Sequence, residues 1–153
     1  MLAMTIATNN LRFPAEVPPS CLRDLYLFGG AVRTITQATT GPVRTQAGPD
    51  RTDIDIRADL ALIAVGAVHR TDGYTTSNVG DAVMMAEMAR RAKRVAIFAD
   101  STKFDHRLFS RVGGLDLADY FVTDTAPSGE LADALAQQEV EIISPTSPPA
   151  QVR

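Results

Sequence analysis

Short, nearly continuous apolar runs are the feature that most constrains the fold of this chain. Each run is bounded by turn-forming residues, and within each run apolar side chains do not alternate with polar ones. The runs occupy residues 3–7, 25–28, 60–65, 95–99, 120–122 and 140–143. Strands that are covered on both faces have this pattern, whereas half-exposed antiparallel strands alternate. The sequence therefore predicts a mostly parallel sheet.

Helical spacing separates the later runs. The first helix is expected to begin after Ser77 or Asn78, either of which can cap it, and to end near Arg91. The second is expected from Ser128 to about Gln138. Strands that alternate with helices predict an α/β, Rossmann-like domain, in which helices flank the sheet and the crossovers are right-handed.

The first half of the chain is less regular. Pro14, Pro18 and Pro19 disfavour a long helix after the first strand. The pairs Gly41-Pro42 and Gly48-Pro49 interrupt the segment before residue 60, where we expect only a short helix. Residues 1–144 are expected to form one domain, and the proline-rich residues 145–153 a disordered tail.

Composition excludes several classes of protein. The net charge of −3 and the pI of about 5.3 argue against a free-standing nucleic-acid binder. Cys21 is the single cysteine, so a reducing cytoplasm is expected. The first residues do not form a signal peptide, and no apolar run approaches the roughly 20 residues of a membrane span. His69 and His106 have no cysteine cluster around them, so neither a metal nor another cofactor is expected.

Polar residues follow the predicted strands, at the edge where ligands of parallel sheets bind. They are Thr8 and Asn9, Gly29 and Gly30, Gly66, the run Asp100, Ser101, Thr102 and Lys103, and finally Thr123 and Asp124. Glycine lets backbone N–H groups approach an anion, hydroxyls share its oxygens and lysine adds a positive charge. The set suits a phosphorylated or polyhydroxylated small molecule. The alternative is that Asp, Ser and Thr are ordinary turn and helix-capping residues.

Several stretches, taken in order, resemble one family. They are "TNN" at 8–10, "LYLFGGAVR" at 25–33, "TTGP" at 39–42, "ADLALIAVGAV" at 58–68, "DGYTTSN" at 72–78, "RVAIFADSTKF" at 94–104, "LFSRV" at 108–112 and "ADYFVTD" at 118–124. The chain resembles the C-terminal effector-sensing domain of DeoR/GlpR-type transcriptional regulators. The sharpest match is residues 100–104, which are similar to the family's Asp-Ser-Ser-Lys-Phe signature.

The resemblance implies a fold shared with ribose-5-phosphate isomerase, glucosamine-6-phosphate deaminase and CoA transferases. It also implies a non-enzymatic, oligomeric sensor of a phosphorylated sugar or related metabolite, which contacts DNA only through a helix-turn-helix domain that this chain lacks. Carried over by position, the residues that line the ligand are Thr8, Asn9, Gly29, Gly30, Thr75, Thr76, Asp100, Ser101 and Lys103, with Lys103 facing the phosphate. The backbone N–H groups of Ser101 and Thr102 are expected to hold the anion.

The chain departs from the family pattern at three places. The family's first strand, with its phosphate loop, is expected to be missing, so the sheet should end early. The family's Asp-Gly-Ile reads Gly66-Ala67-Val68, and its Glu-Val-Lys reads Val83-Met84-Met85. Ionisable groups are thus replaced by groups that cannot ionise. Two alternatives to the sensor remain, namely a sugar-phosphate isomerase-like enzyme and a degenerate domain kept only for oligomerisation.

Overall fold

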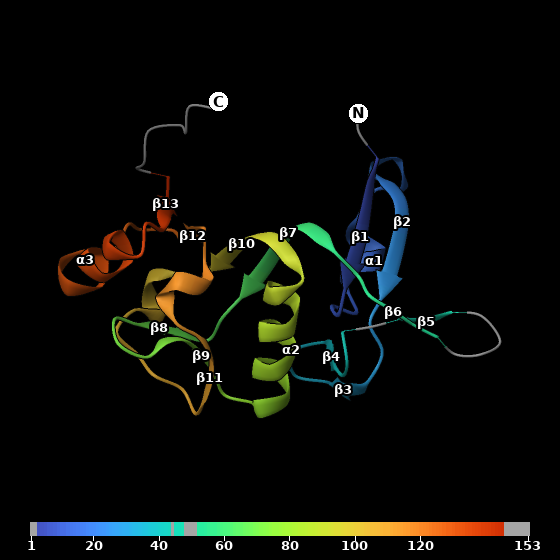
Figure 1. Cartoon of the computed structure of the whole chain (residues 1–153), viewed down its shortest axis with the longest axis horizontal. Helices are drawn as coiled ribbons and strands as arrows, with labels where there is room; N and C mark the ends of the chain where they lie inside the picture. Colours follow the sequence, from blue (N-terminus) through green and yellow to red (C-terminus); the bar gives the residue numbers. More distant parts are fainter. Residues whose placement is uncertain (1–2, 44, 48–51, 146–153) are drawn as a thin grey trace. The chain divides into compact units, whose positions relative to one another are not determined.

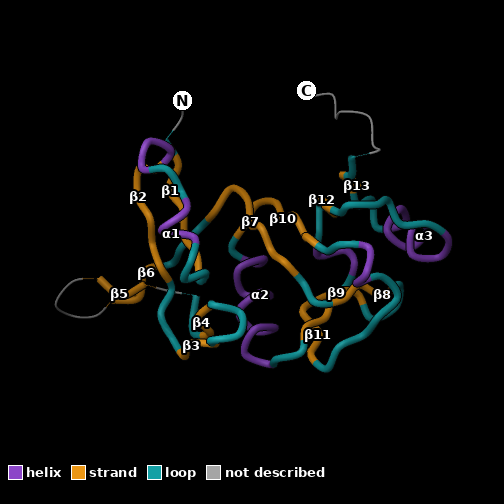
Figure 2. Tube along the Cα trace, turned by 180° about the vertical axis from the view of Figure 1, so that it is seen from behind, coloured by secondary structure: helices purple, strands orange, loops and turns teal. Residues whose placement is uncertain are grey.

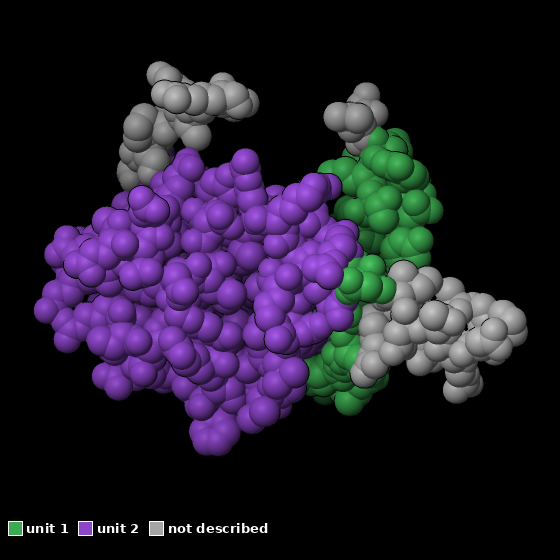
Figure 3. Space-filling model, in the orientation of Figure 1, with its two compact units in different colours: residues 1–56 green, residues 57–153 purple. Residues whose placement is uncertain are grey.

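The computed structural model describes residues 3–43, 45–47 and 52–145. The chain separates into two compact units, Met1–Ile56 and Arg57–Arg153 (Figure 3). Each unit is described by itself below. Almost all of the expected tail, from residue 146 on, lies outside the described residues.

A parallel sheet is the centre of the second unit. Its four strands lie in the order β13-β12-β10-β7, and every neighbouring pair is parallel (Figure 1). The strands are β7 (Ala58–Ala64), β10 (Ala92–Phe98), β12 (Tyr120–Val122) and β13 (Glu141–Ile143). The prediction that the run at 95–99 forms a central strand is confirmed, because β10 lies between β12 and β7.

Two helices pack on one face of this sheet. Helix α2 (Val79–Arg90) begins after Asn78, whose side chain accepts a hydrogen bond from the Asp81 amide at 3.0 Å, as the sequence predicted. Helix α3 (Gly129–Gln137) follows Ser128, although the Ser128 side chain makes no capping hydrogen bond. Ala82 and Ala89 of α2 share one buried cluster with Leu131 and Leu135 of α3. The same cluster contains Ile63, Ile97 and Phe121, the inward side chains of β7, β10 and β12.

The second unit also contains a small antiparallel sheet that the sequence did not predict (Figure 2). Its strands are β8 (Ala67–His69), β9 (Gly73–Thr76) and β11 (Ser110–Gly113), and β9 lies between the other two. Two one-turn helices, η2 (Ser101–Lys103) and η3 (Leu115–Leu117), precede and follow β11 in the sequence. Every residue of β8 and β9 is buried. Segments this short carry too little periodicity to be recognised as strands.

The first unit contains a parallel pair and two antiparallel hairpins. The elements are β1 (Met4–Thr8), α1 (Phe13–Glu16), η1 (Pro19–Cys21), β2 (Leu22–Leu27), β3 (Ala31–Arg33), β4 (Ala38–Thr40), β5 (Thr45–Ala47) and β6 (Thr52–Ile54). Strand β1 pairs with β2 in parallel, and the prolines confine the connection to single turns, as expected. The short helix expected before residue 60 is wrong, because β3 pairs with β4 and β5 with β6. Threonine-rich segments favour strands, and Gln37, at a φ of 51°, allows a tight turn before β4.

No helix among the described residues is long and apolar enough to cross a membrane.

Candidate functional site

The carboxyl ends of the parallel strands in the second unit bring polar groups to one edge of the sheet. Gly66 follows β7, Asp100 follows β10 and Asp124 follows β12. Since the three strands are parallel, their ends lie at the same edge. This arrangement gathers part of the predicted ligand-binding set in the second unit.

The segment after β10 forms the single turn η2. Asp100 caps it, since its Oδ1 accepts a hydrogen bond from the Thr102 amide at 2.9 Å and another from the Thr102 hydroxyl. The Lys103 amide donates to the Asp100 carbonyl at 3.0 Å, which closes the turn. Within the chain, Asp100 therefore acts as a helix-capping residue, which was the alternative interpretation of its place in the sequence.

Asp124, which follows β12, joins this turn to the end of that strand through hydrogen bonds. Its Oδ1 accepts a hydrogen bond from the Ser101 amide at 2.6 Å, and its Oδ2 accepts one from the Ser101 hydroxyl at 3.0 Å. Thr123 also donates to Asp124 Oδ1, at 3.2 Å. The sequence placed Asp124 at a strand end but did not assign it to the ligand. Its partner Ser101 lies in the turn that follows another strand, β10, so only the fold reveals this contact.

The carboxylates occupy the N–H groups that were expected to hold an anion. The Ser101 amide donates to Asp124 and the Thr102 amide to Asp100. Hydrogen bonds from Thr102 lower the pKa of Asp100, with a smaller contribution from the charge of Lys103. The Ser101 amide is the main cause of the lowered pKa of Asp124. Both contacts therefore persist at neutral pH and are lost as the pH falls through the lowered pKa values. A phosphate could reach these N–H groups only if a carboxylate moved.

Lys103 and Phe104 end the same turn. Lys103 is half-buried, and within the described parts of the chain its side chain has no hydrogen bond or ion pair. Phe104 turns back onto the domain, as predicted, because its ring lies 5.8 Å from that of Phe121. A bridge between Phe104 and Val68 also joins the turn to β8.

Gly66, Thr75 and Thr76 lie beside this bridge but have structural partners. The Gly66 amide donates to the Thr75 carbonyl at 3.0 Å, and the Thr75 hydroxyl accepts from the Leu108 amide at 3.0 Å. A side chain on Gly66 would require the Leu108 side chain to move, since an added Cβ would lie 2.5 Å from its Cδ1. Thr76 is buried and pairs with Ser110. The Thr75 hydroxyl is thus engaged within the chain, and Thr76 is a buried residue of the small antiparallel sheet.

The remaining predicted residues gather in the first unit, at the carboxyl ends of β1 and β2. The Thr8 hydroxyl accepts a hydrogen bond from the Asn10 amide at 3.1 Å. The Asn9 side chain donates to the Thr39 carbonyl at 3.0 Å, and the buried Thr39 hydroxyl donates to the Phe28 carbonyl at 2.6 Å. Thr39, which the sequence did not assign to a site, therefore ties both strand ends together.

Gly29 and Gly30 follow β2 and approach the backbone of β4 closely. Gly30 has a φ of +133°, and a Cβ there would lie 2.2 Å from the Thr40 carbonyl oxygen. A Cβ on Gly41 would lie 2.5 Å from the Gly29 carbonyl oxygen. Tight backbone packing explains Gly30 and Gly41 without a ligand, whereas a Cβ on Gly29 would meet nothing within 4 Å.

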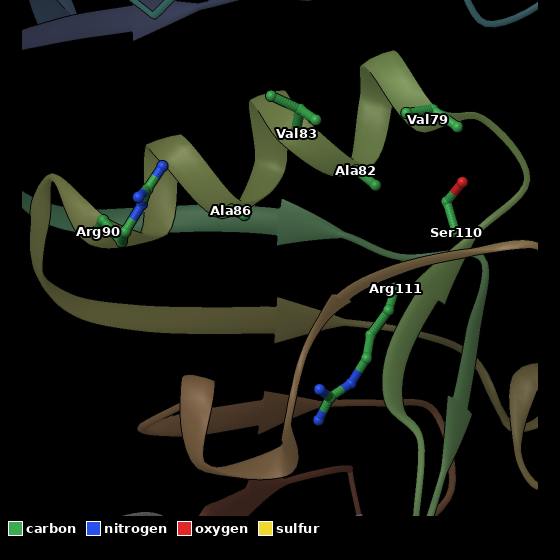
Figure 4. Close-up of a pocket in the computed structure, with 7 residues that line it drawn as sticks. All are labelled: Val79, Ala82, Val83, Ala86, Arg90, Ser110 and Arg111. Atoms are coloured by element: carbon green, nitrogen blue, oxygen red, sulfur yellow. The ribbon is translucent and has the colours of Figure 1, made fainter.

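A groove along α2 adjoins the small antiparallel sheet (Figure 4). It encloses about 510 Å³ and is lined by Val79, Ala82, Val83, Ala86, Arg90, Ser110 and Arg111. The Ser110 hydroxyl is buried and has no hydrogen-bond partner within the described part of the chain. The Arg111 side chain extends away from α2, and its Nε donates to the Asp72 carbonyl at 2.9 Å. The groove is lined mainly by apolar side chains.

Asp72, which lies between β8 and β9, forms an ion pair with Arg107 and contacts His69. Asp72 Oδ2 lies 3.2 Å from His69 Nδ1 and 2.9 Å from Arg107 Nε. Within residues 3–43, 45–47 and 52–145, no group of histidine, cysteine and acidic side chains could hold a metal ion.

The second unit is an α/β domain with polar residues at the ends of its parallel strands, and comparison with known proteins gives the family. The model of the DeoR C-terminal sensor domain matches residues 2–125. The chain is 32% identical over 134 residues to the HTH-type transcriptional regulator GlpR of Haloferax volcanii, covering 88% of this chain and 48% of that protein. It is 25% identical over 142 residues to the HTH-type transcriptional repressor CsqR of Escherichia coli, covering 93% of this chain and 52% of that protein.

This chain belongs to the DeoR C-terminal sensor domain family. It spans about half the length of the curated relatives that it matches. The family resemblance and the α/β fold with a parallel sheet, both predicted from the sequence, are confirmed.

Proposed function

We propose that this domain senses a phosphorylated sugar or a related anionic metabolite in the cytoplasm, as part of a transcriptional regulator. The observation that carries the proposal is the η2 turn. It presents Lys103 and two fixed carboxylates at the carboxyl edge of a parallel sheet, in a chain of a sensor-domain family. Contact with DNA would come from a separate helix-turn-helix domain, and the working form would be a homo-oligomer.

Binding at this turn would change how two strand ends are joined. Asp124 connects the end of β12 to Ser101, and Asp100 caps the turn that leads to Lys103. A phosphate held by Lys103 would repel both carboxylates and compete for the amides that they hold. Release of Asp124 from Ser101 would then separate the turn from β12. This is a local change that a ligand can drive through its preference for one of two states.

A binding role is better supported than catalysis. A sugar-phosphate isomerase needs a positioned general base. The positions where the resemblance places acidic groups carry Gly66, Ala67, Val68 and Val83, and Ala67 and Val68 are fully buried. Asp72 forms an ion pair with Arg107 and lies 3.2 Å from His69 Nδ1.

Thermal unfolding in the presence of candidate metabolites tests the proposal. A ligand that binds only the folded chain, present at 100 times its Kd, should add about 2.7 kcal/mol to the unfolding free energy and raise the Tm by several degrees. The panel should contain sugar phosphates, the matching free sugars and inorganic phosphate. A rise confined to phosphorylated sugars supports the proposal, and no rise with any of them contradicts it. Turnover of ribose 5-phosphate would favour the isomerase instead.

The Asp124→Asn variant should bind the phosphorylated ligand more tightly than the natural chain, by about tenfold. The change removes the negative charge that competes for the Ser101 amide and keeps the size of the side chain. Isothermal titration of both proteins at one ionic strength measures the difference. Asp133→Asn, an exposed change on α3, removes the same charge elsewhere and should leave the affinity within about twofold. Weaker binding by Asp124→Asn would show that Asp124 itself contacts the ligand.

A further inference from the structure

Ser110 has a buried hydroxyl group without a hydrogen-bond partner. The residue is only 8% exposed, and among the described residues its hydroxyl is the one buried side-chain polar group that no hydrogen bond satisfies. A hydroxyl can donate one hydrogen bond and accept others, and a buried polar group left unsatisfied is destabilising. Such a group in a native protein therefore needs an explanation, and a bound ligand is one.

The Ser110 hydroxyl points into the groove that α2 and β11 line. Ser110 and Arg111 are successive residues of β11, so their side chains point to opposite sides. Arg111 extends away from α2, whereas the Ser110 hydroxyl points toward the N-terminal half of the helix (Figure 4). The nearby lining side chains, Val79 and Ala82, offer it no polar atom. A buried water needs several polar partners, so this place favours a ligand that carries a polar group on an apolar body.

The rest of the groove is an apolar stripe along α2. Its members recur at helical spacing and therefore lie on one side of the helix. They are Val79, Ala82, Val83 and Ala86, and Arg90 continues the same stripe at its end. From Val79 to Arg90 the helix rises by about 16 Å. The groove, which encloses about 510 Å³, therefore suits a narrow, elongated molecule with an apolar middle.

Arg90 gives the far end of the groove a positive charge. Arg90 and Arg91 both pair with Glu87, and one carboxylate cannot neutralise two guanidinium groups. The Arg90 side chain is 70% exposed and carries five N–H donors, so it can also bind a ligand. A guanidinium binds a carboxylate through two parallel hydrogen bonds. An acidic group is therefore expected at this end of the groove, opposite Ser110 (Figure 4).

We propose that this groove binds a medium-length aliphatic carboxylic acid whose far end carries a hydroxyl or carbonyl group. The carboxylate lies at Arg90, and the chain lies along the valine and alanine side chains of α2. The terminal oxygen forms a hydrogen bond with the Ser110 hydroxyl, which has no other partner in the described part of the chain. The groove shares no lining residue with the η2 turn, so this site is separate from the one proposed for a phosphorylated sugar.

Three probes of equal chain length test the proposal by isothermal titration. 10-Hydroxydecanoate has both polar ends, decanoate lacks the hydroxyl and 1,10-decanediol lacks the carboxylate. The natural chain should bind 10-hydroxydecanoate about fivefold more tightly than decanoate, because only the hydroxylated acid can form the hydrogen bond with Ser110. Without that hydrogen bond, an apolar groove would prefer decanoate, which is the more apolar acid. 1,10-Decanediol should bind about threefold more weakly than 10-hydroxydecanoate, because it lacks the charge that pairs with Arg90.

Two substitutions locate the site. Ser110→Ala should weaken the binding of 10-hydroxydecanoate by about fivefold and leave that of decanoate within about twofold, because it removes only the hydroxyl. Val83→Asp should weaken the binding of both acids by about tenfold or more, because its carboxylate would repel them and lose water beside the apolar chain. Val32→Asp is the matched control, since Val32 is 57% exposed but lies on β3 of the first unit. Its affinities should stay within about twofold of those of the natural chain.

The proposal is overturned if none of the three probes binds, or if decanoate binds as tightly as 10-hydroxydecanoate. It is also overturned if Ser110→Ala weakens the binding of both acids equally, or if Val32→Asp has the same effect as Val83→Asp. The comparison of the probes on the natural chain needs no variant, so it decides the matter even if Ser110→Ala does not fold.

Discussion

Replacing Phe121 with alanine is expected to lower the free energy of unfolding of the second unit by about 3–5 kcal/mol. The Phe121 side chain is fully buried in the middle of β12. Its ring lies 6.4 Å from that of Tyr74 and 5.8 Å from that of Phe104. Alanine would leave a cavity where the sheet, β9 and the end of the η2 turn meet. Urea unfolding followed by circular dichroism measures the loss.

Phe109→Ala is the control for this change. Phe109 is 85% exposed, so removing its ring should change the unfolding free energy by less than about 0.5 kcal/mol. Equal losses for the two variants would mean that Phe121 is not part of the core. Because Phe104 packs on Phe121 and ends the η2 turn, Phe121→Ala should also loosen the turn that carries Lys103.

The parallel sheet of the second unit could be predicted from the sequence because local signals agree there. Strands β7, β10 and β12 are apolar runs that end in glycine or polar residues, and Asn78 and Ser128 mark the starts of α2 and α3. Each signal lies within one segment, and the right-handed crossover rule then fixes the arrangement. The central place of β10 followed from the same reasoning.

The small antiparallel sheet and the hairpins could not be predicted in this way. Strands β8, β9 and β11 have three or four residues and owe their burial to contacts with distant segments, such as the pairing of Thr76 with Ser110. In the first unit, glycine and proline were taken as helix-limiting residues, whereas they flank threonine-rich strands. Such short strands form because they pair with segments distant in the sequence, and local sequence patterns do not predict that pairing.

The candidate site shows the same division between local and long-range information. Asp100 precedes its partner Thr102 by two residues, and its capping role was one of the two interpretations that the sequence allowed. The contact between Asp124 and Ser101 joins residues that are 23 positions apart. The sequence led to the prediction that the N–H groups of Ser101 and Thr102 hold an external anion, and this stays a prediction. It did not show that the chain's own carboxylates hold them.

Replacing Lys103 with alanine is expected to remove most of the stabilisation that a phosphorylated ligand gives. A hydrogen bond to a charged group contributes about 1.5–3 kcal/mol, so the affinity should fall by about tenfold to a hundredfold. Beside the carboxylates of Asp100 and Asp124, a bound phosphate needs the positive charge of Lys103 to offset their repulsion. Without ligand, the unfolding free energy should change by less than about 0.5 kcal/mol, because Lys103 lies half-buried at the end of a one-turn helix.

Titration of the ligand into Lys103→Ala, Lys93→Ala and the natural chain measures this effect. Lys93 carries the same charge but lies at the opposite, amino-terminal end of β10, where it pairs with Asp59 at 2.7 Å. Its removal should change the affinity by no more than about twofold at physiological salt, because screening weakens distant charges. An equal loss of affinity in both variants would mean that binding depends on the net charge of the chain rather than on the η2 turn. Unchanged binding by Lys103→Ala would mean that residues 100–104 form only a capped turn at the end of β10. The phosphate would then have to bind elsewhere.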